Sequence, residues 1–202
     1  MKLIWNGHAC FTLDTGKDVV VFDPYSPGSV PGWILPQLHG NAVFCSHDHG
    51  DHNYKEGVVI EEKRLSLAMR QIHCFHDNEQ GKLRGTNLIT VIEADNLSIA
   101  HFGDIGHMLS REQIDALGHI DVMLLPVGGH YTIGAEEAKQ LADTVGATAV
   151  IPMHYKGKDY GYDVLSPVDS FLEMYDRQKI VTLHSYMWEF SNDLPNAVIV
   201  FG

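Results

Sequence analysis

The sequence predicts an α/β protein in which two mixed β-sheets pack face to face with helices outside. Three observations lead to this prediction. Short β-type runs dominate the first half of the chain, strands and helices alternate in the second half, and 202 residues, of which 45% are hydrophobic, suffice for one compact domain with a sizeable core. We therefore expect a single domain over residues 1–202.

The first half contains six predicted strands. In chain order they are KLIW at 2–5, FTL at 11–13, VVVF at 19–22, AVFC at 42–45, LITVI at 88–92 and LSIAHF at 97–102. The segments between them carry the Gly, Pro, Asp and Asn residues that are expected of hairpins and loops. The stretch 24–41 is long and loop-like, and it could form a rim or a lid.

The second half alternates strand and helix. IDVMLLP predicts a buried strand that ends at Pro126, and TAVIPM at 148–153 predicts the next one. A helix is predicted over 135–145, with Gly146 as its stop and an apolar stripe of Ala135, Ala138, Leu141, Ala142 and Val145. Two further helix starts are expected, at Ser110 with Gln113 three residues on, and at Ser166 with Pro167 in the first helical position.

Charge and cysteine content exclude several classes of protein. The formal net charge is -12, without a Lys/Arg-rich run, so nucleic acid and anionic membranes are poor partners. The apolar start is interrupted by polar residues, and no apolar run approaches membrane-spanning length, so we expect a cytoplasmic protein. Cys10, Cys45 and Cys74 form no C-x-x-C pair and are expected to be buried, free thiols.

The stretch SHDHGDH, residues 46–52, holds an unusual density of potential metal ligands. In an extended segment His47 and His49 point the same way, and Gly50 can bend the chain so that Asp51 and His52 reach a second point nearby. One isolated histidine would be an ordinary surface or core residue. Four potential ligands in six positions favour a metal site instead.

Three further polar residues stand where predicted strands end. His76 closes the run IHCF, Asp104 follows the strand at 97–102, and His154 follows the strand at 148–153. Side chains at strand ends can converge on one edge of a sheet, which is the layout of a site built from loops on a rigid scaffold. His73 and His101 also lie near strand ends and could replace His76, although both are more simply ordinary strand residues.

Together these residues resemble the metallo-β-lactamase superfamily, whose signature H-x-H-x-D-H is matched by His47, His49, Asp51 and His52. More closely, the chain resembles small metal-dependent hydrolases of the sugar-lactone lactonase-like (ascorbate-phosphate lactonase-like) branch. That likeness rests on WNGHACF, FDPY, GDIGH, PVGGHYTIG and IPMHY, and it covers nearly the whole chain. The resemblance implies an αββα sandwich with a dinuclear metal site at one edge.

The resemblance also implies roles for the ligands. His47, His49 and His76 would bind the first metal, Asp51, His52 and His154 the second, and Asp104 would bridge them. Asp23, in FDPY, would support the metal loop, or it is a turn carboxylate before Pro24. Ser46 is expected to be a loop-forming residue, because nothing marks a base that would activate it.

The ligand set indicates the metal and the chemistry. Imidazole and carboxylate without thiolate suit zinc, although Mn²⁺, Fe²⁺ or Ni²⁺ would accept the same set. Two adjacent divalent cations lower the pKa of water towards about 7, so that hydroxide can attack a substrate, and Asp51 could pass the proton to the leaving group. Redox di-iron relatives generally have a glutamate in place of His49 and a flavin domain, so hydrolysis is favoured.

The substrate is the least defined part of the prediction. His8, His107 and His130 match segments at the rim of the family's active site, and Arg84 and Tyr155 are further candidates for substrate binding. For each of these five residues a structural role or a surface salt bridge is an open alternative. We expect a small ester, lactone or phosphodiester; a phosphodiesterase or nuclease and a non-catalytic metal-binding protein are the alternatives. A homo-oligomer is compatible with the sequence.

Overall fold

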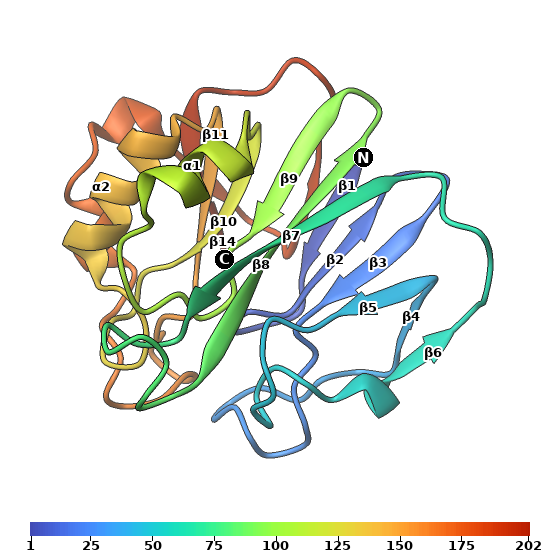
Figure 1. Cartoon of the computed structure of the whole chain (residues 1–202), viewed down its shortest axis with the longest axis horizontal. Helices are drawn as coiled ribbons and strands as arrows, with labels where there is room; N and C mark the ends of the chain where they lie inside the picture. Colours follow the sequence, from blue (N-terminus) through green and yellow to red (C-terminus); the bar gives the residue numbers. More distant parts are fainter.

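The computed structural model describes residues 1–202 and consists of two β-sheets that pack face to face (Figure 1). The five-stranded sheet has the order β13 (Met187–Glu189), β1 (Lys2–Trp5), β2 (Phe11–Asp14), β3 (Val19–Phe22), β5 (Ala42–Phe44). The seven-stranded sheet has the order β12 (Ile180–Leu183), β14 (Ala197–Phe201), β11 (Ala149–Met153), β10 (Val122–Pro126), β9 (Leu97–His101), β8 (Thr86–Ala94), β7 (Ala68–Phe75).

The main core lies between these sheets. One cluster of 41 buried residues takes side chains from both of them, among them Leu13 on β2 and Leu124 on β10. On β3 the alternation is plain, because Val20 and Phe22 belong to this cluster while Val21 points to the opposite face of the sheet. The apolar runs of the sequence are thus explained by burial between two sheets.

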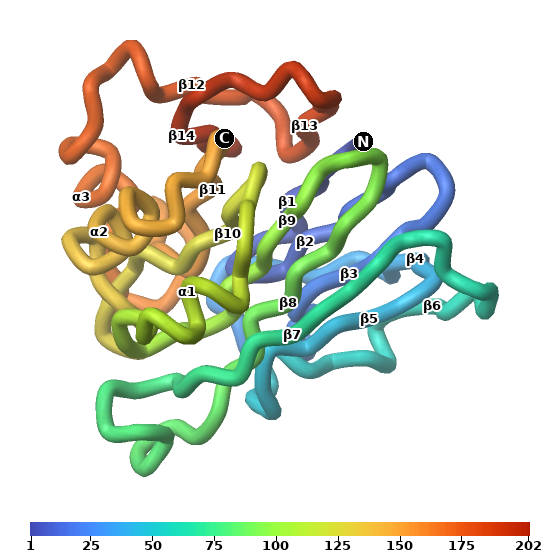
Figure 2. The backbone as a smooth tube through the Cα atoms, turned by 45° about the horizontal axis from the view of Figure 1, so that its top comes forward, coloured from blue at the N-terminus to red at the C-terminus, as the bar shows by residue number.

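Strand direction brings distant parts of the chain to one edge of the larger sheet. β9, β10 and β11 are parallel, whereas β8 is antiparallel to both β7 and β9. β7, β9, β10 and β11 therefore all end at the same edge, and the loops that follow them meet there (Figure 2). This edge is where the predicted ligands emerge.

Three α-helices lie on the outside of the larger sheet (Figure 1): α1 (Arg111–Leu117), α2 (Ala135–Val145) and α3 (Asp169–Leu172). The predicted limits of α2 are confirmed, and Gly146 ends it in a left-handed conformation. Ser110 caps α1 and forms the predicted capping box with Gln113. The helix start at Ser166 is wrong, because its backbone is bonded to Gly128 and Lys156, and α3 begins at Asp169.

The outer face of the five-stranded sheet has no α-helix. A second cluster covers it, formed by Val21 of β3, by Cys10 directly before β2, and by Tyr25, Val30, Leu38 and Val58. Tyr25, Val30 and Leu38 belong to the stretch 24–41, whose prolines at 24, 27, 31 and 36 disfavour a helix. Here the stretch replaces the helical layer of a symmetric αββα sandwich.

Several elements escaped sequence analysis. The small parallel pair β4 (Leu38–Gly40) and β6 (Val58–Ile60), most of β7, and the strands β12 to β14 were not predicted, and two short 3₁₀ helices span Lys55–Gly57 and Arg177–Lys179. The cysteines are free as expected, but Cys45 is partly exposed, so the prediction of burial is wrong for it. None of the helices has the length and apolar character needed to cross a membrane.

Candidate metal centre

The H-x-H-x-D-H motif lies in a turn that follows β5. The backbone N–H groups of His52 and Asn53 both donate to the carbonyl oxygen of His49, at 2.9 and 3.0 Å, so the predicted extended conformation is wrong here. The turn nevertheless brings the rings of His47 and His49 together, with centroids 4.6 Å apart. The two histidines share one point because the chain bends, and not because side chains alternate.

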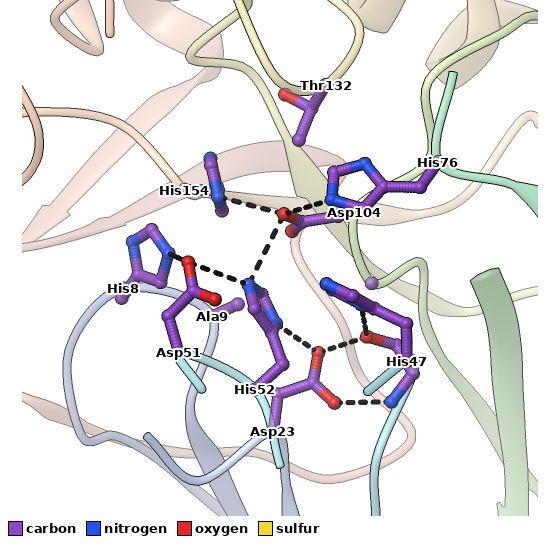
Figure 3. A network of polar contacts seen from close by, with 12 residues as sticks. His8, Ala9, Asp23, His47, Asp51, His52, His76, Asp104, Thr132 and His154 are labelled. Carbon is purple, nitrogen blue, oxygen red and sulfur yellow. Dashed lines mark hydrogen bonds and ion pairs between the residues drawn. The ribbon is translucent and has the colours of Figure 1, made fainter. Parts of the chain in front are cut away.

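Asp23 anchors this turn. Its Oδ1 accepts the Ser46 N–H at 2.7 Å, and its Oδ2 accepts the Ser46 hydroxyl at 2.6 Å and the Nδ1–H of His52 at 2.8 Å. Since the Ser46 hydroxyl donates to Asp23, it accepts from Nδ1 of His47, 2.9 Å away. Both histidines therefore present an Nε2 lone pair to the site (Figure 3), and supporting the metal loop is the interpretation of Asp23 that the geometry favours.

Strand ends supply three more groups to the same place. His76 follows β7, Asp104 follows β9 and His154 follows β11. Gly103 allows the chain after β9 to lie directly against Ser46. Its φ is +55°, and a Cβ there would lie 2.3 Å from the Cβ of Ser46. The backbone N–H of Asp104 then donates to Oδ1 of the buried Asn87 at 2.9 Å, which fixes the carboxylate in place.

Asp104 is the centre of the cluster. Its Oδ2 lies 3.0 Å from Nε2 of His154, 3.3 Å from Nε2 of His52 and 3.4 Å from Nε2 of His76 (Figure 3). Burial would raise the pKa of Asp104, but His154 and His52 hold it well below its usual range. Burial would likewise lower the pKa of His52, but the carboxylates of Asp104 and Asp23 raise it well above its usual range. The same negative surroundings would attract a metal cation.

The donor atoms fit a metal in position and in chemistry. Ligand atoms within 4.8 Å of one another occur in three groups, which are His47, His49, His76; His47, His52, Asp104; and His8, Asp51, His52, His154. Nε2 of His47, His52 and His154 and Oδ1 of Asp104 are buried without a hydrogen-bond partner. Buried polar atoms are rarely left unpaired, so the chemistry of these donor atoms fits a bound cation. The structure thus brings all seven predicted ligands together.

His8 joins them instead of standing at the rim. Its side chain is buried, its ring centroid lies 4.0 Å from that of His154, and its Nε2 is 3.6 Å from Oδ2 of Asp51. Burial, together with His154, lowers the pKa of His8 to about 4. Its φ of 56° is uncommon for a residue with a side chain. The prediction of a rim position is therefore wrong, and His8 belongs to the wall of the metal centre.

The two alternative ligands are excluded by their surroundings. His73 is exposed, because the neighbouring side chains on β7, Ile72 and Cys74, point to the core. The ring of His101 lies between the sheets, where Nε2 contacts the carbonyl oxygen of Ala9 at 2.8 Å and Nδ1 accepts the N–H of Gly103. His73 therefore points to solvent and away from the cluster, and His101 has no ring nitrogen left for a metal, which leaves His76.

Three predicted substrate residues do not line the site. His107 has both ring nitrogens bonded to backbone, at Phe75 and Met108. His130 is exposed on its loop, with its ring against Tyr131. Tyr155 is buried in the core against Trp5. For His107 and Tyr155 the structure favours the alternative of a structural role over substrate binding. Arg84, in contrast, does line the site.

A cavity of about 270 Å³ opens over the metal centre. Its floor is formed by four of the predicted ligands, and Arg84, Tyr131 and Tyr162 form its wall. The hydroxyl of Tyr162 lies 3.1 Å from Oδ2 of Asp51 and contacts the carbonyl oxygen of Ser29. Part of the stretch 24–41 is thus at the rim. A larger groove of about 910 Å³, beside α1 and the β8–β9 hairpin, contains none of the ligands.

Tyr131 and Tyr162 line the cavity but were not among the predicted site residues. Tyr131 stands inside PVGGHYTIG, directly after His130, so the motif pointed to the right loop but to the wrong residue. Tyr162 follows a Gly-rich segment without a motif of its own. Only the folding of that segment against Ser29 brings it to the cavity.

Two packed sheets with a His/Asp cluster at one edge define a protein of the metallo-β-lactamase type, and comparison with known proteins agrees. Residues 2–154 match the family model described as the beta-lactamase superfamily domain. The chain belongs to this superfamily. It is 34% identical over 188 residues to a UPF0173 metal-dependent hydrolase from Methanoregula boonei, covering 77% of this chain and 82% of the relative.

Solved structures show the same fold. A protein from Thermotoga maritima, described as a candidate Zn-dependent hydrolase of the metallo-β-lactamase superfamily, superposes with a TM-score of 0.79 at 33% identity, covering 99% of this chain and 97% of that chain. Igni18, a metallo hydrolase from Ignicoccus hospitalis, superposes with a TM-score of 0.65 at 19% identity, covering 86% and 89%. At 19% identity, the likeness to Igni18 shows the fold alone.

Proposed function

We propose that this protein is a hydrolase that uses two divalent metal ions, most favourably zinc, to cleave a small ester, lactone or phosphodiester. One observation carries the proposal: seven His and Asp side chains from four loops converge at one sheet edge, with buried donor atoms that lack partners. The names of the relatives, metal-dependent hydrolases, support it. Lactone preference rests on the sequence resemblance alone.

His47, His49 and His76 would hold one metal, and Asp51, His52 and His154 the other, with Asp104 between them. When bound, two such cations supply water of lowered pKa and polarise the bond to be broken. The absence of a thiolate from the donor set favours zinc or a similar borderline ion over a soft one. Asp23 would keep the rings of His47 and His52 oriented, since it fixes which nitrogen carries the proton.

The position of Asp51 suits proton transfer. Its carboxylate lines the cavity and is 20% exposed, and its Oδ2 lies near the Tyr162 hydroxyl and near Nε2 of His8. A carboxylate held by two such neighbours keeps one orientation, so that it can take a proton and deliver it to a leaving group in the cavity. The size of the cavity favours a small-molecule substrate over a polymer.

The metal content of the purified protein tests the proposal first. We expect about two divalent metals per chain by elemental analysis of protein prepared without chelator, because the proposed ligands form two sets of three on either side of Asp104. His76→Ala and Asp104→Ala should lose metal, and kcat/KM for a responsive ester, lactone or phosphodiester should fall at least about a hundredfold. A panel of such substrates, including bis(4-nitrophenyl) phosphate, identifies the class.

His184→Ala and Asp115→Ala are matched controls, since both residues are exposed and lie outside the cluster. They should keep the metal content and activity of the parent. Trace metal in the parent, even after incubation with zinc or manganese, would contradict the metal centre. Full metal occupancy without turnover of any substrate would favour a non-catalytic metal-binding protein.

A further inference from the structure

Arg84 is the only lysine or arginine in the lining of the cavity, and its side chain has no ion-pair or hydrogen-bond partner in the protein. No carboxylate lies within 4.0 Å of its guanidinium group, and its side chain donates no hydrogen bond to another residue. Arg70 and Arg111, by contrast, are paired with Glu93 and Asp115. The open alternative of a surface salt bridge therefore does not apply to Arg84.

The guanidinium group contacts an aromatic ring although it has no ion partner. Its Cζ lies 5.6 Å from the centre of the Tyr131 ring, a cation–π contact. The backbone N–H of Arg84 donates to Oδ2 of Asp77 at 2.7 Å. Contacts to the ring at one end and to the backbone at the other limit the positions that the side chain can take. The donors of a guanidinium group stacked in this way remain available at its edges.

Asp77 organises the whole loop that carries Arg84. Its two carboxylate oxygens accept the backbone N–H groups of Glu79, Gly81, Leu83 and Arg84, at 2.7 to 3.0 Å. The loop begins directly after His76, so that the floor and the wall of the cavity are parts of one structural unit. The backbone of the loop that brings Arg84 to the wall is thus ordered by Asp77.

We infer that the substrate carries a second negatively charged oxyanion group, a carboxylate or a phosphate, which Arg84 binds at the wall while the bond to be cleaved lies over the metal ligands. This inference rests on the proposed hydrolase function and narrows its substrate class. A planar fork of N–H donors suits the two oxygens of such a group. In a chain of net charge -12, an unpaired arginine facing a cavity is otherwise unexplained.

The binding test uses the metal-loaded protein and calorimetry, so that it does not depend on turnover. Succinate carries two carboxylates, and monomethyl succinate lacks one of them. We expect the parent to bind succinate about tenfold more tightly, because a charge-assisted bidentate contact is worth at least that factor. 3-Phosphonopropionate in place of succinate shows whether the second group is better matched as a phosphate.

Variants of the loop assign the effect to Arg84. Arg84→Gln should reduce the preference for succinate to within about threefold, and Arg84→Lys should keep part of it, because lysine retains the charge but not the fork. Lys82→Gln is the matched control: it removes the same charge from an exposed position in the same loop, outside the cavity, and should leave the preference unchanged. No preference in the parent, or an equal one in Arg84→Gln, would overturn the inference.

Hydrolysis of mono-4-nitrophenyl succinate and of its methyl ester is measured on the same preparations. The parent should prefer the charged ester about tenfold in kcat/KM, and Arg84→Gln should lose that preference. Turnover of neither ester would count against the hydrolase proposal for esters, while calorimetry would still decide whether Arg84 binds an oxyanion. Turnover of both esters at equal rates by the parent and by Arg84→Gln would overturn the inference and leave the proposed function standing.

Discussion

The buried carboxylate of Asp23 orients the rings of two proposed metal ligands, His47 and His52. It contacts no predicted substrate position, yet it accepts hydrogen bonds from both the backbone and the hydroxyl of Ser46 and from the ring of His52. Through Ser46 it also determines which nitrogen of His47 faces the site. Orientation of this kind raises metal affinity because the rings do not have to be reorganised when the ion binds.

Asp23→Asn should therefore weaken metal binding. An amide keeps the shape but turns one acceptor into a donor, so the contact with Nδ1–H of His52 or with Ser46 is lost. We expect about a 10- to 100-fold loss of affinity, measured by competition with a chromogenic chelator. Asp48→Asn, an exposed change in the same motif, is the control. Equal affinity in Asp23→Asn and the parent would contradict this role.

At the scale of elements, strand ends and helix ends decide where loops begin. β7, β9 and β11 finish at one edge, and each is followed by a ligand. The helix α2 returns the chain from β10 to β11, and its end is defined by Gly146, with φ 70° and ψ 32°. Such a left-handed position suits glycine because a Cβ would be strained there.

Gly146→Ala tests this end of α2. A Cβ at this position would meet nothing within 4 Å, so the only cost is the backbone conformation. We expect the free energy of unfolding to fall by about 1 kcal/mol, measured by urea denaturation with circular dichroism. Gly146→Asn should lose clearly less, because asparagine tolerates the left-handed region. If both variants were as stable as the parent, the helix end would not depend on this conformation.

At the scale of the whole molecule, the core joins the two sheets. The cluster of 41 buried residues includes side chains from both, so neither sheet can lose its partner without exposing apolar surface. A single cooperative unit is what this arrangement predicts, in keeping with the expected single domain. The metal centre lies at the edge of this unit and depends on it for its geometry.

Leu124→Ala should therefore destabilise both sheets together. Leu124 is fully buried on β10, and its truncation should cost about 2–5 kcal/mol. Trp5 and Trp188 lie in the five-stranded sheet and Trp33 packs on Trp5, so tryptophan fluorescence reports on this side of the molecule, while circular dichroism includes the helices beside the other sheet. Both transitions should shift equally and coincide. Ile34→Ala, at a 91% exposed position, should shift neither. Separate transitions would indicate two folding units.

Those parts of the structure that depend on local pattern could be predicted from the amino-acid sequence. Apolar runs marked the central strands, spacing and capping residues defined α2 and the start of α1, and H-x-H-x-D-H identified four potential ligands within one turn. Such features can be read from neighbours in the chain, because hydrogen bonding and side-chain direction over a few residues produce them. Even so, the motif adopts a bend that its spacing alone did not reveal.

Tertiary packing selects which of the 13 histidines lie in the candidate metal centre and which residues form the wall above it. His73 and His101 differ from His76 in their packing against neighbouring strands, and His8 proved to lie inside the centre. Arg84, Tyr131 and Tyr162 come from three loops that are far apart in the chain. Their convergence follows from strand order and direction, which are set by burial of the whole core and not by any local stretch of sequence.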